Sequence, residues 1–266
     1  MKSILLLAAA ALAMVIPAKA QSIRVRGSDT LGAKLVPQLA EAFKKKSGGS
    51  SFDIAAEGSS TAFTNLAAGT ADIGMSSRRV KDEERTFCKT KGVFIKEHAL
   101  AWDMITVVVN KNNPVANLTK KQIAGIFTGA IKDWSEVGGA PGPISIYTRN
   151  TSSGTYRDWM TLAMSNKDYA KGSQKLAGNE QICAEVAGNK NGIGYVGLAY
   201  ATSKGLKAVS VDGVAPVAAN VKGYPYSRPT YLYTNGDPAG KVKEFLDFCK
   251  SAEGLAIVQR TGFIAR

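Results

Sequence analysis

Three short segments of the sequence combine small hydroxyl residues and glycine with the expected start of a helix. They read RGSDTLG, EGSSTAF and RNTSSGTYRDW, and each follows an apolar run typical of a strand. The first N–H groups of a helix have no partner inside the helix, and the helix dipole adds about half a positive charge at that end. Glycine lets a ligand approach the backbone, and Ser and Thr add hydroxyl donors. The three segments together predict a site for a compact anion.

The candidate binding residues of these loops are mostly small and polar: Ser28, Asp29, Thr30 and Leu31 in the first, Ser59 and Ser60 in the second, and Ser153, Gly154 and Thr155 in the third. Each loop taken alone is also explained by helix capping, for which Ser and Thr are ordinary residues. Three such loops at corresponding strand–helix junctions favour a common ligand, because ligands of open α/β sheets bind at the carboxyl ends of the strands.

Arg149 stands immediately before the third loop. A guanidinium can hold two oxygens of an oxyanion at once, so we expect Arg149 to contact the ligand. A protonated oxyanion such as hydrogen phosphate also needs an acceptor for its proton, which a carboxylate would supply while repelling sulfate. Asp29 and Glu57 lie in two of the loops and are the candidates for that acceptor, although acidic residues at a helix N-terminus are commonly caps.

The residue pattern favours binding over turnover. The sequence has no Walker lysine pattern, no carboxylate cluster that would hold a metal, and no base next to a serine. The single histidine, His98, lies in the apolar-flanked stretch EHALAW, and we expect it to be structural, so a Ser-His-Asp site is not supported. We therefore predict a protein that is not an enzyme and that uses no metal or cofactor.

Residues 1–20 have the pattern of a cleavable signal peptide. Lys2 is followed by the apolar run ILLLAAAALAMVI and by the small-residue cleavage site AKA. An uncleaved membrane anchor is the alternative, although the run is shorter than the about 18–20 apolar residues of a typical span. We expect an exported chain that begins near Gln21.

The charge of the exported chain is strongly positive. Cleavage removes two of the 34 basic residues and none of the 21 acidic residues, which leaves a net charge of +11. This charge would attract an anionic small ligand, or it would simply keep the exported protein soluble. The lysine runs are typical of solvated helix ends. A nucleic-acid partner is not expected, because no basic stripe with interleaved aromatic residues is present.

Strand-like and helix-like segments alternate along the chain, which predicts an α/β protein with mostly parallel sheets. The uninterrupted apolar run MITVVVN predicts a strand buried on both faces, and Pro37 predicts a kink or a second start in the first helix. The expected strands are 22–27, 51–56, 71–77, 104–110, 143–149, 193–200, 206–211 and 229–235. The expected helices are 31–43, 60–69, 80–92, 119–129, 154–164, 239–249 and 253–259.

Four segments of the chain resemble, in order, segments of the phosphate-binding proteins of bacterial ABC phosphate transporters: GSDTLGAKL, EGSSTAFTNLAAGTADIGMSSR, TRNTSSGT and NGIGYVGLAY. The resemblance implies a monomeric periplasmic binding protein of the two-lobed, type II-like fold, which encloses phosphate in a cleft and delivers it to an ABC permease. The implied lobes are 21–103 with 231–266, and 104–230. They are joined by crossover strands near Ala101–Asn110 and Pro229–Asn235.

The resemblance also implies roles for single residues. It places phosphate on Thr30 and Leu31, on Ser59, on Arg149 and on the loop Ser153, Gly154 and Thr155. The best-known members have an aspartate that accepts the phosphate proton where this chain has Ser77, within DIGMSSRR. Because Ser77 can accept or donate, sulfate, tungstate and arsenate stay as alternatives to phosphate. A secreted phosphatase-like enzyme and a surface interaction protein are alternatives of other classes.

Three cysteines, Cys88, Cys183 and Cys249, allow one disulfide in an exported chain, with three possible pairings. The implied lobes place Cys88 and Cys249 together and Cys183 in the other lobe. A bond between the lobes would resist hinge motion, so Cys88–Cys249 is the expected pair if a bond forms.

Overall fold

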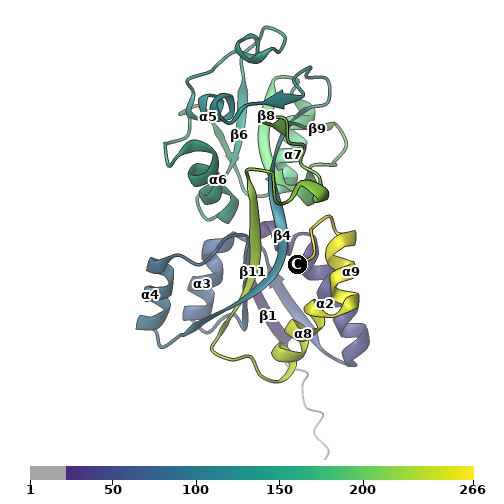
Figure 1. Ribbon diagram of the computed structural model, residues 1–266. Helices are drawn as coiled ribbons and strands as arrows, with labels where there is room; N and C mark the ends of the chain where they lie inside the picture. Colours follow the sequence, from purple (N-terminus) through teal and green to yellow (C-terminus); the bar gives the residue numbers. More distant parts are fainter. Residues whose placement is uncertain (1–21) are drawn as a thin grey trace, which may run out of the picture.

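Two lobes are joined by two long strands. The structure is a computed structural model that describes residues 22–266, and the predicted signal peptide, 1–20, lies outside them. Figure 1 shows β4 (Ile95–Asn110) and β11 (Ser227–Asn235) running between the lobes. The chain leaves the first lobe in β4 and returns in β11, so the N-terminal strand and the C-terminal helices lie in the same lobe. Among the described residues, no helix has the length and apolar character needed to cross a bilayer.

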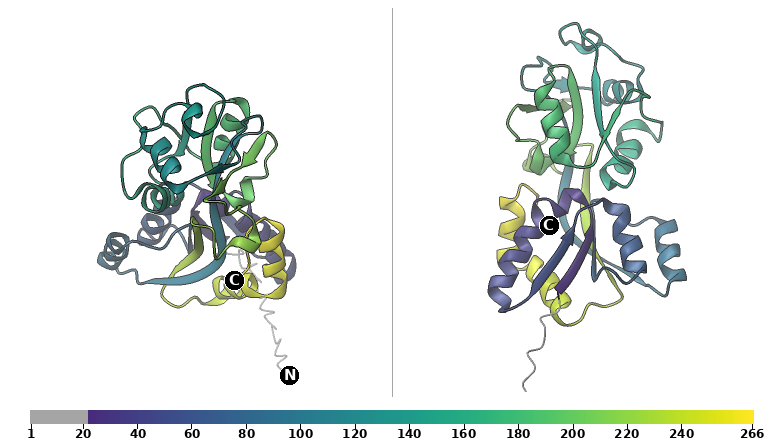
Figure 2. Two further views of the ribbon diagram at one scale, coloured as in Figure 1. Left: turned by 45° about the horizontal axis from the view of Figure 1, so that its top comes forward. Right: turned by 180° about the vertical axis from the view of Figure 1, so that it is seen from behind.

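The first lobe is built on parallel strands with helices on both sides (Figure 2). Its strands lie in the order β2, β1, β3, and each of them leads into a helix. The ring centroids of Phe43 and Phe52 lie 5.5 and 4.9 Å from the ring centroid of Phe245, and the three rings pack on one side of the sheet. The elements are β1 (Ser22–Gly27), α1 (Asp29–Gly32), α2 (Leu35–Ser47), β2 (Ser51–Ala55), α3 (Ser59–Ala67), β3 (Ile73–Ser76), α4 (Asp82–Thr90), α8 (Gly240–Lys250) and α9 (Ala252–Arg260).

The second lobe has the strand order β8, β6, β7, again parallel between β8 and β6 and between β6 and β7. The rings of Trp159 on α6 and Tyr195 on β8 stack with their centroids 4.5 Å apart, which fixes α6 against the sheet. The elements are β5 (Asn117–Leu118), α5 (Lys120–Thr128), β6 (Ser145–Arg149), α6 (Gly154–Met164), β7 (Gln174–Leu176), α7 (Asn179–Gly188), β8 (Gly192–Gly197), β9 (Leu206–Ala208) and β10 (Ser210–Val211).

The two joining strands make the lobes share one sheet, in the order β2-β1-β3-β11-β4-β8-β6-β7. They pair antiparallel with each other, and also with β3 on one side and β8 on the other. The prediction of parallel strands therefore holds inside each lobe, and the joining strands are the antiparallel exception. Residues 104–110 are all buried, as their apolar run predicted.

Local sequence signals located most of the helices. The first predicted helix is divided: α1 ends at Gly32, α2 begins at Leu35, and Pro37 lies in the first turn of α2, where a missing N–H breaks no helical bond. Helix α7 was not predicted, although its buried residues have helical spacing: Asn179, Ile182, Cys183 and Val186.

The expected disulfide is wrong, because all three cysteines are free and buried. Cys88 lies in the core on the α3–α4 side of the first lobe, where its thiol donates to Phe63 O at 3.4 Å. Cys249 lies in the separate core cluster on the other side of that sheet. Cys183 donates to Tyr200 O at 3.6 Å in the second lobe. Belonging to one lobe does not bring two side chains to the same face of its sheet.

We predict that protein denatured without reductant reacts with DTNB at three thiols per chain. The folded protein should react far more slowly, because burial raises the pKa of the Cys88, Cys183 and Cys249 thiols and blocks access. Absorbance of the released thionitrobenzoate measures both quantities, and C88S, with two thiols, is the control. A yield of one thiol from denatured wild type would show that a disulfide forms.

Candidate functional site

The three predicted loops meet between the lobes. Thr30 Oγ1, at the start of α1, lies 3.1 Å from Thr155 Oγ1, at the start of α6. Ser60 N, in the first turn of α3, donates to Ser152 O at 3.1 Å. The N-terminal ends of three helices therefore lie together, which is the arrangement that the predicted anion site requires.

Two serines of the first lobe lie directly against the second lobe. The hydroxyls of Ser59 and Ser77 are 3.2 Å apart, and Ser77 N donates to Ser59 Oγ at 3.1 Å. Both residues are buried. A Cβ atom at Gly154 would lie 2.3 Å from Ser59 Oγ and 2.8 Å from Ser77 Oγ. Only glycine permits such an approach, so Gly154 sets how closely the lobes meet here.

Three of the predicted residues shape the helix ends. Ser153 is the N-cap of α6, and its hydroxyl accepts a hydrogen bond from Tyr156 N at 3.2 Å. Ser28 is the buried residue before α1, and its N–H donates to Met75 O at 2.8 Å. The side chain of Leu31 belongs to the hydrophobic core, so what Leu31 offers an anion is its backbone N–H.

Arg149 is a buried cation with unused donors. It lies at the end of β6 and is only 1 % exposed. Its Nη2 donates to Ala177 O at 2.7 Å, and Nη1 lies 3.3 Å from Asp29 Oδ2. Nε and Nη1 are buried without a hydrogen bond among the described residues. Burial lowers the pKa of Arg149 from its ordinary value, and the charge of Asp29 opposes this. Unsatisfied buried donors cost about 1–3 kcal/mol each, which an anion would offset.

The aromatic core of the second lobe holds Arg149 in place. Thr148 Oγ1 lies 2.5 Å from Tyr195 OH, which also accepts from Arg149 N at 3.4 Å and lies 2.8 Å from Tyr169 OH. Burial raises the pKa of Tyr195 to about 12, so its hydroxyl stays protonated at neutral pH. The strand end before the third loop is thus fixed by a tyrosine that also stacks on Trp159.

The two predicted proton acceptors have different surroundings. Asp29 Oδ2 accepts from Asn179 N at 3.0 Å and from Asn179 Nδ2 at 2.7 Å, in addition to its approach to Arg149. Asp29 therefore ties the first lobe to the N-terminal end of α7 in the second lobe. Glu57 is exposed, and its backbone carbonyl accepts from Ser152 Oγ at 2.8 Å. The side chain of Glu57 lies at the surface, whereas Oδ2 of Asp29 is already bound by donors.

Arg78 is a buried cation that the sequence analysis did not assign to the site. Its Nη1 and Nη2 donate to the carboxylate of Glu84 at 2.7 and 2.5 Å, and Nη2 lies 3.2 Å from Ser60 Oγ. The hydroxyl of Ser60 therefore faces this ion pair, while its backbone N–H faces Ser152. These two contacts fix Ser60 in the first turn of α3, and its role in ligand binding stays a prediction.

A second unpredicted group surrounds Arg228 on β11. Its Nη2 donates to Thr155 Oγ1 at 2.7 Å and to Asp103 Oδ2 at 3.1 Å, and its Nη1 donates to Asp158 Oδ2 at 3.0 Å. Asp103 is fully buried on β4. Burial raises the pKa of both carboxyls, against the lowering effect of Arg228. The available sequence signal was an aspartate beside the apolar strand MITVVVN, a place where charges are rare unless paired.

The described residues contain no group of three or more His, Cys, Asp or Glu side chains that could hold a metal ion. His98 Nε2 lies 2.8 Å from Thr234 Oγ1 on the neighbouring strand, so the histidine has a structural contact.

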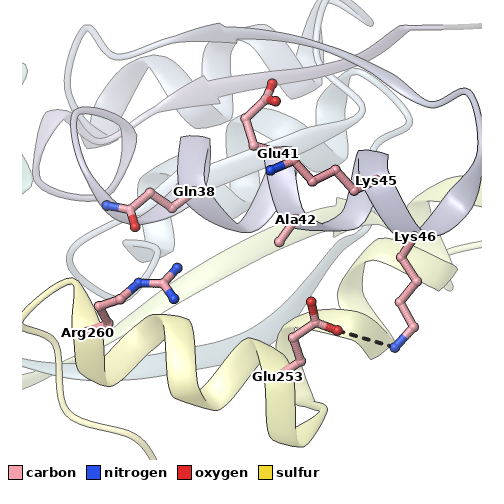
Figure 3. A pocket seen from close by; sticks show the side chains of 7 residues that line it. All are labelled: Gln38, Glu41, Ala42, Lys45, Lys46, Glu253 and Arg260. Carbon is pink, nitrogen blue, oxygen red and sulfur yellow. Dashed lines mark hydrogen bonds and ion pairs between the residues drawn. The ribbon is translucent and has the colours of Figure 1, made fainter.

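A separate surface hollow of about 620 Å³ lies between α2 and α9 (Figure 3). Its charged side chains are of both signs, and Lys46 Nζ lies 3.4 Å from Glu253 Oε2. None of its residues belongs to the three loops, so the hollow is distinct from the anion site. It is lined by Gln38, Glu41, Ala42, Lys45, Lys46, Glu253 and Arg260.

Comparison with known proteins gives relatives along nearly the whole chain. Residues 16–253 match the family described as the PBP superfamily domain. The chain is 32% identical over 248 residues to the phosphate-binding protein PstS of Bacillus subtilis, across 91% of this chain and 80% of that protein. It is also 32% identical over 263 residues to PstS of Pseudomonas aeruginosa, across 90% of this chain and 81% of that protein.

Solved structures share both lobes. A Clostridium perfringens protein assigned as a phosphate ABC transporter substrate-binding protein, solved with bound phosphate, has a TM-score of 0.85 and 36% identity, over 92% of this chain and 100% of that chain. An ABC-type phosphate transport receptor from Vibrio cholerae has a TM-score of 0.75 and 29% identity, over 92% and 100%. The chain therefore belongs to the PBP superfamily, in the family of the phosphate-binding PstS proteins.

Proposed function

We propose that this protein captures inorganic phosphate between its lobes and hands it to an ABC permease. The observation that carries the proposal is Arg149, a buried guanidinium with unused donors beside the N-terminal ends of α1, α3 and α6. The PstS relatives and the phosphate in the Clostridium perfringens structure support the same ligand here. The family consists of substrate-binding transport proteins, which supports binding without turnover.

The phosphate oxygens are held from both lobes in this proposal. The first lobe supplies N–H groups and hydroxyls at Thr30, Leu31 and Ser59, and the second supplies Arg149 and the first turn of α6. Each hydrogen bond to a charged group contributes about 1.5–3 kcal/mol. Several such bonds, less the costs of desolvation and ordering, give micromolar affinity or better, about −8 kcal/mol.

Ligand binding and lobe closure are coupled in this proposal. We assign 21–103 with 231–266 to lobe one and 104–230 to lobe two. Contacts such as Thr30 to Thr155 and Asp29 to Asn179 join these lobes, as a closed form requires. A ligand that contacts both lobes favours the closed form, because its contacts exist together only when the lobes meet. We place the bending in β4 and β11, whose pairing is irregular between Thr230 and Tyr231.

The export pattern of 1–20 supports a periplasmic location, where members of this class meet their permease. We propose that the chain acts as a monomer, because a single chain supplies both lobes of the site.

A second ligand class is favoured by one residue, Ser77. A hydroxyl at this place does not repel sulfate as a carboxylate would, and the carboxylate of Asp29 is engaged by Asn179 and Arg149. Sulfate, arsenate and tungstate are therefore the second candidates for the ligand.

We predict that Arg149→Ala weakens phosphate binding by at least about 100-fold, because two or more charge-assisted hydrogen bonds are lost. Isothermal titration calorimetry measures the affinity, and circular dichroism checks the fold. Arg157→Ala, an exposed arginine one turn into α6, is the matched control and should bind as wild type. Unchanged affinity in Arg149→Ala would overturn the assignment of the site.

We predict that Ser77→Asp raises the preference for phosphate over sulfate by at least about tenfold. The new carboxylate accepts the phosphate proton and repels an anion that has none. A thermal-shift series with phosphate, arsenate, sulfate and tungstate, on wild type and variant, measures the change. An unaltered preference would assign proton recognition to another acceptor, Asp29 being the first to test.

We predict that Gly154→Ala prevents full closure without unfolding either lobe. The added methyl meets Ser59 and Ser77 of the other lobe, so it is accommodated only when the lobes are apart. Phosphate affinity should fall at least about tenfold, and the phosphate-induced decrease in the radius of gyration, measured by small-angle X-ray scattering, should shrink. Gly188→Ala, where a Cβ has no atom within 4 Å, is the control. Full compaction in Gly154→Ala would contradict this account.

A further inference from the structure

The side chain of Arg228 is fixed on all sides. It is 4 % exposed, and its Nε, Nη1 and Nη2 all donate hydrogen bonds. Its partners come from different parts of the fold: Asp103 from β4, and Asp158 and Thr155 from α6. Arg228 itself is the second residue of β11. One guanidinium therefore connects both joining strands with the helix whose N-terminal end lies in the anion site.

The chemistry of arginine sets the direction of the bond to Thr155. A guanidinium has donors and no acceptor, so at 2.7 Å Thr155 Oγ1 must accept from Arg228 Nη2. The hydrogen of Thr155 is then available to an acceptor, which is Thr30 Oγ1, 3.1 Å away, or a bound anion. Accepting from a cation also polarises the hydroxyl, which strengthens it as a donor and weakens its remaining lone pair.

Two other hydroxyls of the site receive N–H donors in the same way. Thr30 Oγ1 lies 3.3 Å from Asn179 Nδ2, and Ser59 Oγ accepts from Ser77 N at 3.1 Å. Within residues 22–266, no N–H group donates to the hydroxyl of Ser77. Each hydroxyl of Thr30, Ser59 and Thr155 thus has one lone pair used by an N–H donor and keeps its hydrogen for an acceptor. The hydroxyl of Ser77 lies 3.2 Å from Ser59 Oγ, and either oxygen can donate in that contact.

We propose that Arg228 is a positioning and selectivity residue, which holds the Thr155 hydroxyl as a hydrogen-bond donor to the bound oxyanion. The proposal rests on the proposed function, because it needs an anion between the lobes. It assigns Arg228 no direct contact with the ligand. It also assigns Asp103 and Asp158 the role of orienting Arg228, since each accepts from a different edge of the guanidinium.

A structural role of Arg228 is the competing explanation, and a double-mutant cycle separates the two. If Arg228 acts through Thr155, Arg228→Lys weakens phosphate binding about tenfold in wild type and has little effect in Thr155→Val, because the hydroxyl is already gone. If Arg228 only supports the fold, the fold-losses in phosphate affinity caused by Arg228→Lys and by Thr155→Val multiply in the double variant. Thr155→Ser keeps the hydroxyl, so in that background Arg228→Lys should again cost about tenfold.

The experiment is calorimetric titration of each variant with phosphate, arsenate and sulfate, with thermal melting to check folding. Arg24→Lys, in a separate arginine–aspartate pair with Asp72, is the matched control and should not alter binding. Should Arg228→Lys fail to fold, Asp158→Asn replaces it in the cycle, because it loosens Arg228 while Asp103 keeps its partner. Losses of phosphate affinity that multiply in either double-mutant cycle overturn the proposal. Wild type that binds none of the anions overturns the proposed function instead.

Discussion

Arg149 carries a guanidinium into the interior of the protein and uses only part of its donors there. Removing a charge from water costs free energy that the surroundings must offset. Asp29 supplies one opposite charge across the meeting point of the lobes, at 3.3 Å. The N-terminal ends of α1, α3 and α6 add positive electrostatic potential at the same place, so they do not offset the charge of Arg149. A compact, doubly negative ligand offsets both effects, so affinity for such an anion follows from how the cation is placed.

The joining strands tie this electrostatic constraint to the shape of the molecule. β4 and β11 connect the two halves of the sheet that the lobes share. β4 carries Asp103, which accepts from Arg228 on β11, and Arg228 also donates to Asp158 and Thr155 on α6. In the proposed closure, bending of these strands moves a hydrogen-bond network that ends at the hydroxyl of Thr155. The proposal therefore has closure and recognition use the same side chains, which couples them directly.

The residues of the candidate site that could be predicted are those marked by local sequence signals. Ser, Thr and Gly at three strand ends marked the helix starts, and Arg149 stood beside one of them. The missed contacts join distant positions: Arg228 lies 125 residues from Asp103, and Asn179 lies 150 from Asp29. No pattern within a strand or helix specifies such partners. The disulfide prediction failed for a related reason, since it used the lobe of each cysteine and not the face of the sheet.

Ser77 stands where the resemblance to phosphate-binding proteins implies an aspartate, and in the proposed site this difference changes which anions can be discriminated. Oδ2 of Asp29 is used by Asn179 and Arg149, so this oxygen joins the lobes, and only Oδ1 is left for a ligand proton. The other groups of the proposed site are N–H groups, the guanidinium of Arg149 and hydroxyls, so donors outnumber acceptors. An excess of donors favours the more ionised form of any protonatable anion, because each proton on the ligand removes an acceptor and adds a donor without a partner. In the proposed site, selectivity then depends on the directions in which the hydroxyls are held, because Ser77 supplies no carboxylate to repel sulfate.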